Sequence, residues 1–246
     1  MKLSEVKTEG NVKVLIIGAP GAGKTCFSAS FPGPVLYLDF DNKVDSAALF
    51  YKNNPELLDN IEVRQLSVNF ASDPINEFNK LISDELIPQQ KQNKLKYKTI
   101  VLDSISAFSS LVLNHILITN PGIPAQKTAQ GLVPSQTHYG ILLREFGRMI
   151  PGLLSLPCNI VMCAHVDTYK DDSTGSIIRE AMMDGSYSKK LPQAFKEVWH
   201  LHVDDKGKRW AQTQADSKFS CLRSQIPGLP NPLSIDEGYK SLAKYL

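Results

Sequence analysis

Four short, mainly apolar segments recur along the first two thirds of the chain, and polar or small residues follow each of them. They cover residues 12–17, 34–40, 98–103 and 159–164. Continuous apolar runs of this length are typical of strands that are buried on both faces of a parallel sheet. The carboxyl ends of such strands meet at one edge of the sheet, where ligands bind. We therefore expect functional side chains directly after each segment.

Between these segments, apolar residues recur at three- and four-residue spacing, which predicts helices at 46–53, 74–86, 104–118 and 139–154. The alternation predicts an α/β fold with a mostly parallel sheet flanked by helices. Residues 199–224 differ, because WHLHVD and RWAQTQ flank the turn DKGK, and KFSCLRS follows. This order predicts three antiparallel strands at the C-terminal end of the sheet.

Two long stretches, residues 120–137 and 169–190, are rich in turn-forming and polar residues and predict loops that are mobile without a partner. Long loops in compact domains usually serve function. The whole chain, residues 1–246, is expected to form a single domain with these two loops.

Composition narrows the class of protein without naming a function. The chain has 246 residues, 42% of them hydrophobic, which excludes a disordered or fibrous protein. Its apolar runs fall short of the roughly 18 to 20 residues that a membrane-spanning helix needs, and residues 1–8 lack a secretory signal. We expect a cytoplasmic protein with no membrane partner and with reduced cysteines. The net charge of +2 permits nucleic-acid binding but does not indicate it.

Residues 18–25, GAPGAGKT, match the full phosphate-loop pattern between a predicted strand and a helix-compatible stretch at 26–30. In this pattern the loop surrounds the β-phosphate of ATP, Lys24 reaches the β- and γ-phosphates, and the Thr25 hydroxyl binds Mg²⁺. The predicted nucleotide-binding residues are Gly18, Ala19, Pro20, Gly21, Ala22, Gly23, Lys24, Thr25 and Cys26.

Acidic and imidazole groups follow the other strands. Asp103 ends the third segment and fits an acid that holds Mg²⁺, with a helix N-cap as the alternative. Asp41 is the better candidate than Asp39 for orienting the attacking water, and solvated loop acids are the alternative. His165 follows the fourth segment and fits a γ-phosphate sensor, or else a core histidine. Asn42 opens an N-K-x-D pattern, which we interpret as coincidence because guanine-reading motifs follow a later strand.

These segments together resemble a known family. GAPGAGKT, YLDFD, TIVLDS, CAHVD and the order of YSKKLPQAFKEVWHL, hairpin and KFSCLR resemble the RecA-type ATPase core. The chain looks most similar to the small phage RecA-like single-strand annealing ATPases, the fourth Sak type, over nearly its whole length. The resemblance implies an ATP-dependent protein that forms rings or filaments and acts on single-stranded DNA during recombination, in the host cytoplasm if it is phage-encoded. The resemblance also implies a single-strand-binding protein or an exonuclease as a further partner.

The resemblance also implies roles for particular residues. It places the catalytic carboxylate at Asp41, where most RecA-type proteins carry Glu, so we expect slow, DNA-stimulated ATP hydrolysis. It places the sensor at His165 and basic residues that reach the neighbouring subunit's nucleotide at Lys218 and Arg223. DNA-binding loops would be 120–137 and 169–190. In the second, the expected DNA contacts are Lys170, Arg179, Lys189 and Lys190 on phosphates and Tyr169 and Tyr187 as stacking faces.

Three alternatives stay open from the sequence. The loop at 169–190 is also consistent with a solvated polar loop, because acidic residues dilute its positive charge. A P-loop small-molecule kinase would share the phosphate loop, although the arginines are dispersed. A nucleotide-switch loader or regulator with little turnover is the third alternative, since Asp replaces Glu at position 41.

Overall fold

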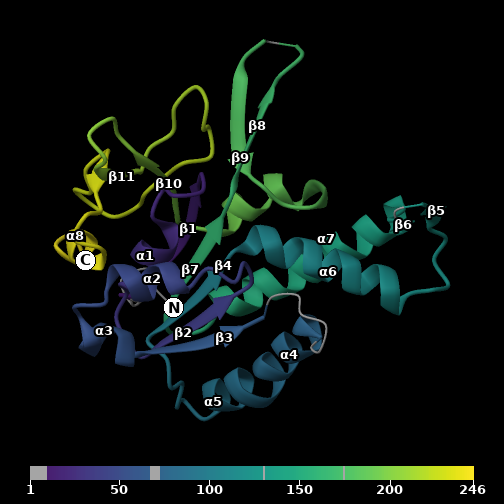
Figure 1. Ribbon diagram of the computed structural model, residues 1–246, viewed down its shortest axis with the longest axis horizontal. Coiled ribbons are helices and arrows are strands. Elements are labelled where there is room, and N and C mark those ends of the chain that lie inside the picture. Colours follow the sequence, from purple (N-terminus) through teal and green to yellow (C-terminus); the bar gives the residue numbers. More distant parts are fainter. Residues whose placement is uncertain (1–9, 67–72, 130, 174) are drawn as a thin grey trace, which may run out of the picture.

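An eight-stranded sheet forms the centre of the computed structural model, which describes residues 10–66, 73–129, 131–173 and 175–246 (Figure 1). The strand order is β12-β11-β10-β1-β7-β4-β2-β3. The strands from β10 to β3 pair in parallel, and β11 and β12 run antiparallel. Their bounds are β1 Lys13–Gly18, β2 Val35–Asp39, β3 Ile61–Gln65, β4 Thr99–Asp103, β7 Asn159–Ala164, β10 Glu197–Val203, β11 Arg209–Gln212 and β12 Leu233–Ser234. This arrangement confirms the predicted α/β fold.

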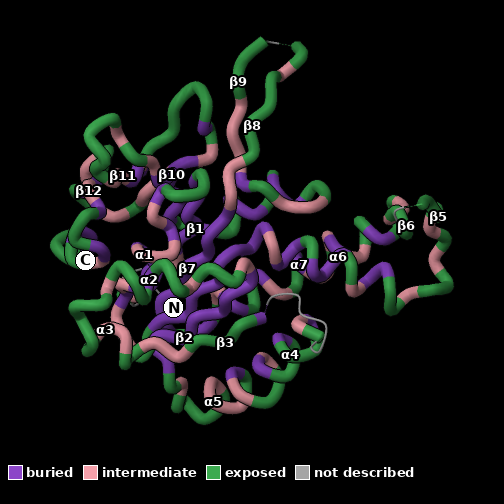
Figure 2. The backbone as a smooth tube through the Cα atoms, viewed as in Figure 1, coloured by how far each residue is buried: buried purple, intermediate pink, exposed green. Residues whose placement is uncertain are grey.

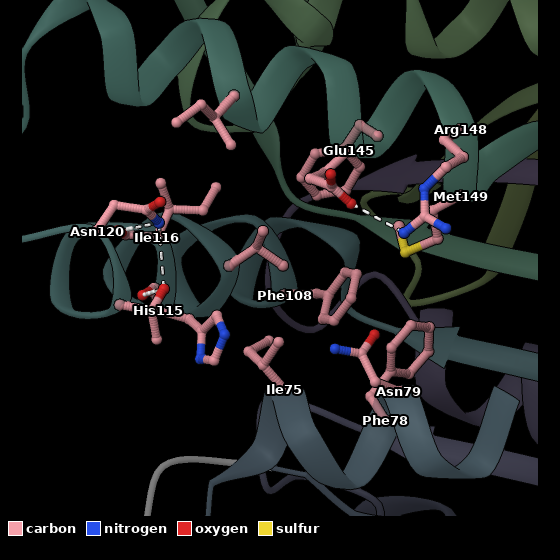
Figure 3. A pocket seen from close by; sticks show the side chains of 14 residues that line it. Ile75, Phe78, Asn79, Phe108, His115, Ile116, Asn120, Glu145, Arg148 and Met149 are labelled. Atoms are coloured by element: carbon pink, nitrogen blue, oxygen red, sulfur yellow. Dashed lines mark hydrogen bonds and ion pairs between the residues drawn. The ribbon is translucent and has the colours of Figure 1, made fainter. Parts of the chain in front are cut away.

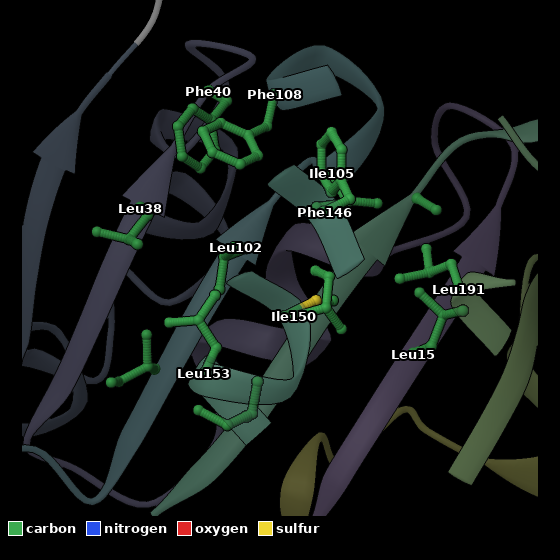
Figure 4. Packing of buried hydrophobic residues seen from close by; sticks show 14 of the residues in the cluster. Leu15, Leu38, Phe40, Leu102, Ile105, Phe108, Phe146, Ile150, Leu153 and Leu191 are labelled. Atoms are coloured by element: carbon green, nitrogen blue, oxygen red, sulfur yellow. The ribbon is translucent and has the colours of Figure 1, made fainter. Parts of the chain in front are cut away.

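Helices cover both faces of the sheet, because alternate side chains of the buried strands point to opposite faces. Leu15 and Ile17 of β1 belong to a large apolar cluster with α4, α6 and α7, whereas Val14 and Ile16 belong to a second cluster with α1, α2 and α8. Figure 4 shows the first cluster, in which α7 lies across the strands. The helices are α1 Lys24–Ala29, α2 Asp45–Phe50, α3 Pro55–Asp59, α4 Pro74–Lys80, α5 Ile87–Lys91, α6 Ile105–Thr119, α7 Gln136–Leu154 and α8 Tyr239–Ala243.

Several elements differ from the sequence expectations. β3 was not expected, because its IEVRQ sequence is polar and it forms an edge strand with three exposed residues. The helix expected over 74–86 changes at Leu81 into a π-helix, η2 (Leu81–Leu86), before α5. KFSCLRS is not a strand, since in this region the structure has an isolated bridge between Val198 and Arg223. Of the strands predicted for residues 199–224, the hairpin of β10 and β11 is present as predicted. The strand that pairs next to β11 is β12, which comes later in the chain.

The two predicted loops contain regular structure in their described residues. Residues 120–137 contain the short hairpin of β5 (Gln126–Thr128) and β6 (Gly131–Val133), beyond the ends of α6 and α7, and the start of α7 (Figure 1). β8 (Val166–Lys170) and β9 (Ile177–Ala181) form an antiparallel ribbon that projects from the sheet, with most of β8 exposed (Figure 2). Two 3₁₀ turns, η3 (Gly185–Lys189) and η4 (Leu191–Ala194), follow. The ribbon was not predicted because the segment around its strands is rich in Asp, Ser, Gly and Lys, which favour loops.

Residues 1–8, 130 and 174 belong to segments for which the sequence made predictions, and they lie outside the described residues. Within the described ranges, no helix has both the length and the apolar character that crossing a bilayer requires.

Candidate nucleotide-binding site

The GAPGAGKT segment is the loop between a buried strand and a helix, since β1 ends at Gly18 and α1 begins at Lys24. Gly21 and Gly23 have φ angles of +81° and +92°, in the left-handed region that favours glycine. A Cβ atom on Gly18 would lie 2.8 Å from the carbonyl oxygen of Leu201, which is too close for packed atoms. The glycines therefore fix the path of this loop around the start of α1.

Lys24 lies inside the loop, with 6% of its surface exposed. Its Nζ donates hydrogen bonds to the carbonyl oxygens of Gly18, at 2.8 Å, and Ala19, at 3.1 Å. Burial lowers the pKa of the Lys24 ammonium group, and nearby acidic groups only partly offset this effect. A phosphate oxygen held by the loop would give this ammonium group an anionic partner, which forms a stronger hydrogen bond than a carbonyl does.

Thr25 of α1 and Asp103 of β4 meet at the carboxyl edge of the sheet, although β7 lies between β4 and β1, the strand that leads into α1. The Thr25 hydroxyl donates to Oδ2 of Asp103 at 2.7 Å, and the Tyr37 hydroxyl donates to the same oxygen at 2.6 Å. The N-cap alternative for Asp103 is wrong, because Ser104 caps α6 by accepting from the N–H of Ala107. A carboxylate beside a threonine hydroxyl is the oxygen donor set that suits Mg²⁺ with nucleotide phosphates.

Asp41 and Asp39 have separate roles, as the sequence suggested. The Asp39 carboxylate accepts from the backbone N–H groups of Lys43, at 3.2 Å, and Val44, at 3.1 Å, and so holds the turn into α2. Oδ2 of Asp41 lies 2.9 Å from Nε2 of His165 and 3.8 Å from Nζ of Lys43. Asp41 is therefore the carboxylate that meets the residue after β7, across the intervening β4.

The environment of Asp41 keeps it ionised. Burial by itself would raise the pKa of this carboxyl group, but the hydrogen bond and charge of His165 and the charge of Lys43 lower it overall. An ionised carboxylate only accepts hydrogen bonds, so Nε2 of His165 carries the shared proton. Nδ1 of His165 is buried and has no hydrogen-bond partner among the described residues.

One cleft of about 440 Å³ is lined by Lys24, Thr25, Asp41, Asp103 and His165. Five further lining residues were not predicted: Lys43, Asp45, Ser46, Phe50 and Arg209. The Arg209 guanidinium carbon lies 5.4 Å from the centre of the Phe50 ring, and its side chain packs against Gly23. Arg209 comes from β11, on the other side of β10 from β1, and no local pattern in RWAQTQ could show that it returns to the phosphate loop.

The residues that the resemblance placed on DNA differ in how far they are exposed. Lys170, Lys189 and Lys190 are exposed, and Arg179 is half-buried on β9. The expectation that Tyr187 stacks on a base is wrong, because this residue is 7% exposed and its ring lies 5.4 Å from that of Phe146. Tyr169, on β8, is exposed and keeps a free stacking surface.

The expectation that Arg223 reaches a neighbouring subunit does not fit its contacts. Its Nε donates to the carbonyl oxygen of Phe195 at 3.0 Å, and its Nη2 donates to that of Pro192. Arg223 is half-buried, and its guanidinium group holds η4 and the residue that follows it within the same chain. Lys218, in contrast, is exposed.

A second cavity, of about 310 Å³, lies between α4, α6 and α7 on one face of the sheet (Figure 3). Its floor is apolar, with Phe78 and Phe108, and its rim carries Glu145 and Arg148, which form an ion pair. It shares no residue with the cleft at the phosphate loop.

The core is that of a P-loop NTPase. Its defining features are a phosphate loop with glycines at positive φ, a buried lysine, and a threonine–aspartate pair at the carboxyl edge of a parallel sheet. The model of the AAA domain family matches residues 10–220, and the chain belongs to this family. Membership supports nucleotide binding by the cleft described above. No curated protein matches the chain.

Proposed function

We propose that the protein is an ATPase that binds single-stranded DNA along the β8–β9 ribbon and promotes annealing or strand pairing as an ATP-bound oligomer. The observation that carries this proposal is the hydrogen bond between Asp41 and His165. His165 immediately precedes β8, so the carboxylate of the nucleotide cleft is bonded to the residue from which the ribbon starts. A DNA strand bound to the ribbon and a γ-phosphate in the cleft would then both affect the hydrogen bond between Asp41 and His165.

Hydrolysis at this site needs few groups. The phosphate loop and Lys24 hold the phosphates of ATP, and Thr25 and Asp103 would hold Mg²⁺, which neutralises the charge that develops on the transferring phosphoryl group. The ionised Asp41 accepts a hydrogen bond from the water that attacks the γ-phosphate and orients it for in-line attack. In the resting geometry Asp41 also engages His165, so this contact competes with water for the carboxylate. We infer slow turnover that rises when DNA draws His165 away.

The exposed lysines favour a nucleic-acid ligand for the ribbon. Lys170 lies on β8, and Lys189 and Lys190 follow the ribbon at η3. Cations that track a backbone and an exposed aromatic ring such as Tyr169 are the usual elements of a single-strand surface. Assembly is part of the proposal because Lys218 is an exposed cation that could complete a neighbour's cleft.

A measurement of ATP hydrolysis with and without single-stranded DNA tests this proposal. We expect stimulation by DNA, release of phosphate to water, and loss of the stimulation in His165→Ala. Double-stranded DNA at the same phosphate concentration serves as the control ligand. Turnover that is indifferent to single strands contradicts the proposal, and phosphate transfer to a small acceptor indicates a kinase.

One observation favours a second candidate, a nucleotide switch with little turnover. The lowered pKa of Asp41 makes it a weak proton acceptor, and His165 and Lys43 already occupy its oxygen. A switch would bind ATP and ADP with different consequences for DNA affinity while hydrolysing ATP at a negligible rate. Nucleotide-dependent DNA binding without phosphate release distinguishes this candidate.

A further inference from the structure

The largest of the three cavities described for this chain, about 570 Å³, opens on the outer side of the phosphate loop. One wall is the loop itself, from Ala19 to Ala22. The second wall is the base of the ribbon, with Thr168 and Arg179, and the third is the end of β10, with His200 and His202. The cavity therefore lies between the nucleotide loop and the proposed DNA-binding ribbon, and its volume is in the range of about 300–1,000 Å³ typical of ligand pockets.

Aromatic rings form a column at the β10 wall. The rings of His200 and His202 stack with centroids 5.5 Å apart and an interplanar angle of 17°. On the other side of His200, the Phe219 ring lies 4.4 Å away at 32°. Phe219 and His200 are buried, whereas His202 is half-buried at the end of the column. The column thus presents one terminal ring, His202, to the cavity that it lines.

The charges around the column favour a neutral occupant over a polyphosphate. Burial lowers the pKa of His200 to about 4, and repulsion from His202 and Arg179 contributes, so this imidazole is neutral at pH 7. Among the described residues that line the cavity, Arg179 is the only lysine or arginine, and its guanidinium carbon lies 5.9 Å from the centre of the Phe219 ring. Flat aromatic ring faces beside one guanidinium group suit a planar heterocycle, which stacks on its flat surface.

We propose that this cavity holds an unstacked nucleobase, and that His202 is the ring on which the base stacks. The inference rests on the proposed function for the source of the base, which is the strand bound to the ribbon. A base in this position would touch the phosphate loop from outside while ATP occupies the cleft inside. It would give DNA a second route to the nucleotide, separate from His165.

Binding of matched oligonucleotides to the full-length protein tests the site. One strand carries a single 2-aminopurine between abasic residues, and the other is abasic throughout, with the same length and phosphate number. The nucleotide cleft is saturated with a non-hydrolysable ATP analogue. Base stacking predicts that the strand with the base binds about 5- to 150-fold more tightly, with quenched 2-aminopurine fluorescence. His202→Ala should remove this difference, His202→Phe should retain it, and His115→Ala, a histidine on α6, should not change it.

Equal preference for the base in wild type and His202→Ala would overturn the assignment, provided that both proteins unfold at similar temperatures. If His202→Ala does not fold, the comparison of wild type with His202→Phe decides, because unquenched fluorescence in both overturns the site. If wild type binds neither strand, the DNA-binding proposal fails on its own. Free 2-aminopurine riboside then decides: saturable quenching that His202→Ala abolishes identifies a site for free nucleosides, and no quenching overturns the base site as well.

Discussion

Nε2 of His165 lies 2.9 Å from Oδ2 of Asp41, which joins the ends of β7 and β2 across the intervening β4. The bond connects an acid that lines the cleft at the phosphate loop to the residue before the exposed ribbon. Neither group is free to act without affecting the other. Asp41 therefore acts in this cleft as one half of a hydrogen-bonded pair.

The first prediction concerns this pair. Asp41→Asn should lower turnover with little change in ATP affinity, because a group that orients water acts mainly in the transition state. His165→Ala should release the carboxylate, raise the basal rate and remove its dependence on DNA. Steady-state phosphate release and nucleotide titration measure both effects, with Asp205→Asn, an exposed acid in the β10–β11 turn, as the control. Unchanged turnover in Asp41→Asn would move the catalytic role elsewhere.

Lys24 gives the second prediction. The hydrogen bonds of its ammonium group go to two carbonyl oxygens of the phosphate loop. Lys24→Ala should therefore keep the fold while the affinity for ATP falls. Loss of charge-assisted hydrogen bonds to phosphate is worth about 1.5–3 kcal/mol, or roughly 10- to 150-fold in Kd. Calorimetric titration and a thermal melt measure the two properties, and Lys91→Ala on α5 is the matched control. Equal affinity in Lys24→Ala and wild type would contradict the assigned site.

The sheet and the phosphate loop could be predicted from the sequence because both depend on local signals. Buried strands give continuous apolar runs in the sequence. The phosphate loop needs positive φ angles at positions 21 and 23, and the motif has glycine at both. Arg209 could not be predicted, since its place beside Gly23 arises from the pairing of β11 with β10. The tyrosine at position 187 was misassigned for the same reason: only packing against α7 shows that its ring is buried.

The third prediction is a pH dependence of stability that originates at His200. The folded pKa is about 4, whereas in the unfolded chain it returns to about 6.5. Between these values the unfolded state binds a proton that the folded state does not, so stability is complete above pH 6.5 and falls as the pH drops toward 4. The loss should reach up to about 3 kcal/mol. Urea unfolding of wild type and His200→Phe at pH 7.5 and 5 measures it, and the same drop in both would contradict the assignment.

The fourth prediction separates Lys218 from Arg223. Arg223→Ala removes two hydrogen bonds to carbonyl groups and should lower the free energy of unfolding by about 1–3 kcal/mol. Lys218→Ala should leave stability unchanged but reduce turnover if Lys218 completes a neighbour's cleft. Mixing Lys218→Ala subunits with Asp41→Asn subunits should then restore some activity, because one mixed interface contains both intact halves. Mixtures that equal the weighted average over a range of ratios would contradict a role between subunits.

The last prediction concerns the ribbon and its flanking lysines. Each phosphate contact with a single strand contributes a slope of about −0.7 to log affinity against log salt. The double change Lys189→Ala and Lys190→Ala should therefore flatten the slope by about 1.4 if both lysines contact phosphate. The double change Lys91→Ala and Lys94→Ala, which removes two exposed lysines at the end of α5, should leave it unchanged.

The two tyrosines should respond differently in the same titrations. Tyr169→Ala should weaken binding by about 1–3 kcal/mol if its exposed ring stacks on a base, with no change in stability. Tyr187→Ala should instead lower stability by about 3–5 kcal/mol, because it removes a buried ring that packs against Phe146. Fluorescence anisotropy at several salt concentrations and urea unfolding separate these effects. A salt slope that is identical in wild type and the Lys189, Lys190 double variant, together with full affinity in Tyr169→Ala, would place the DNA surface elsewhere on the molecule.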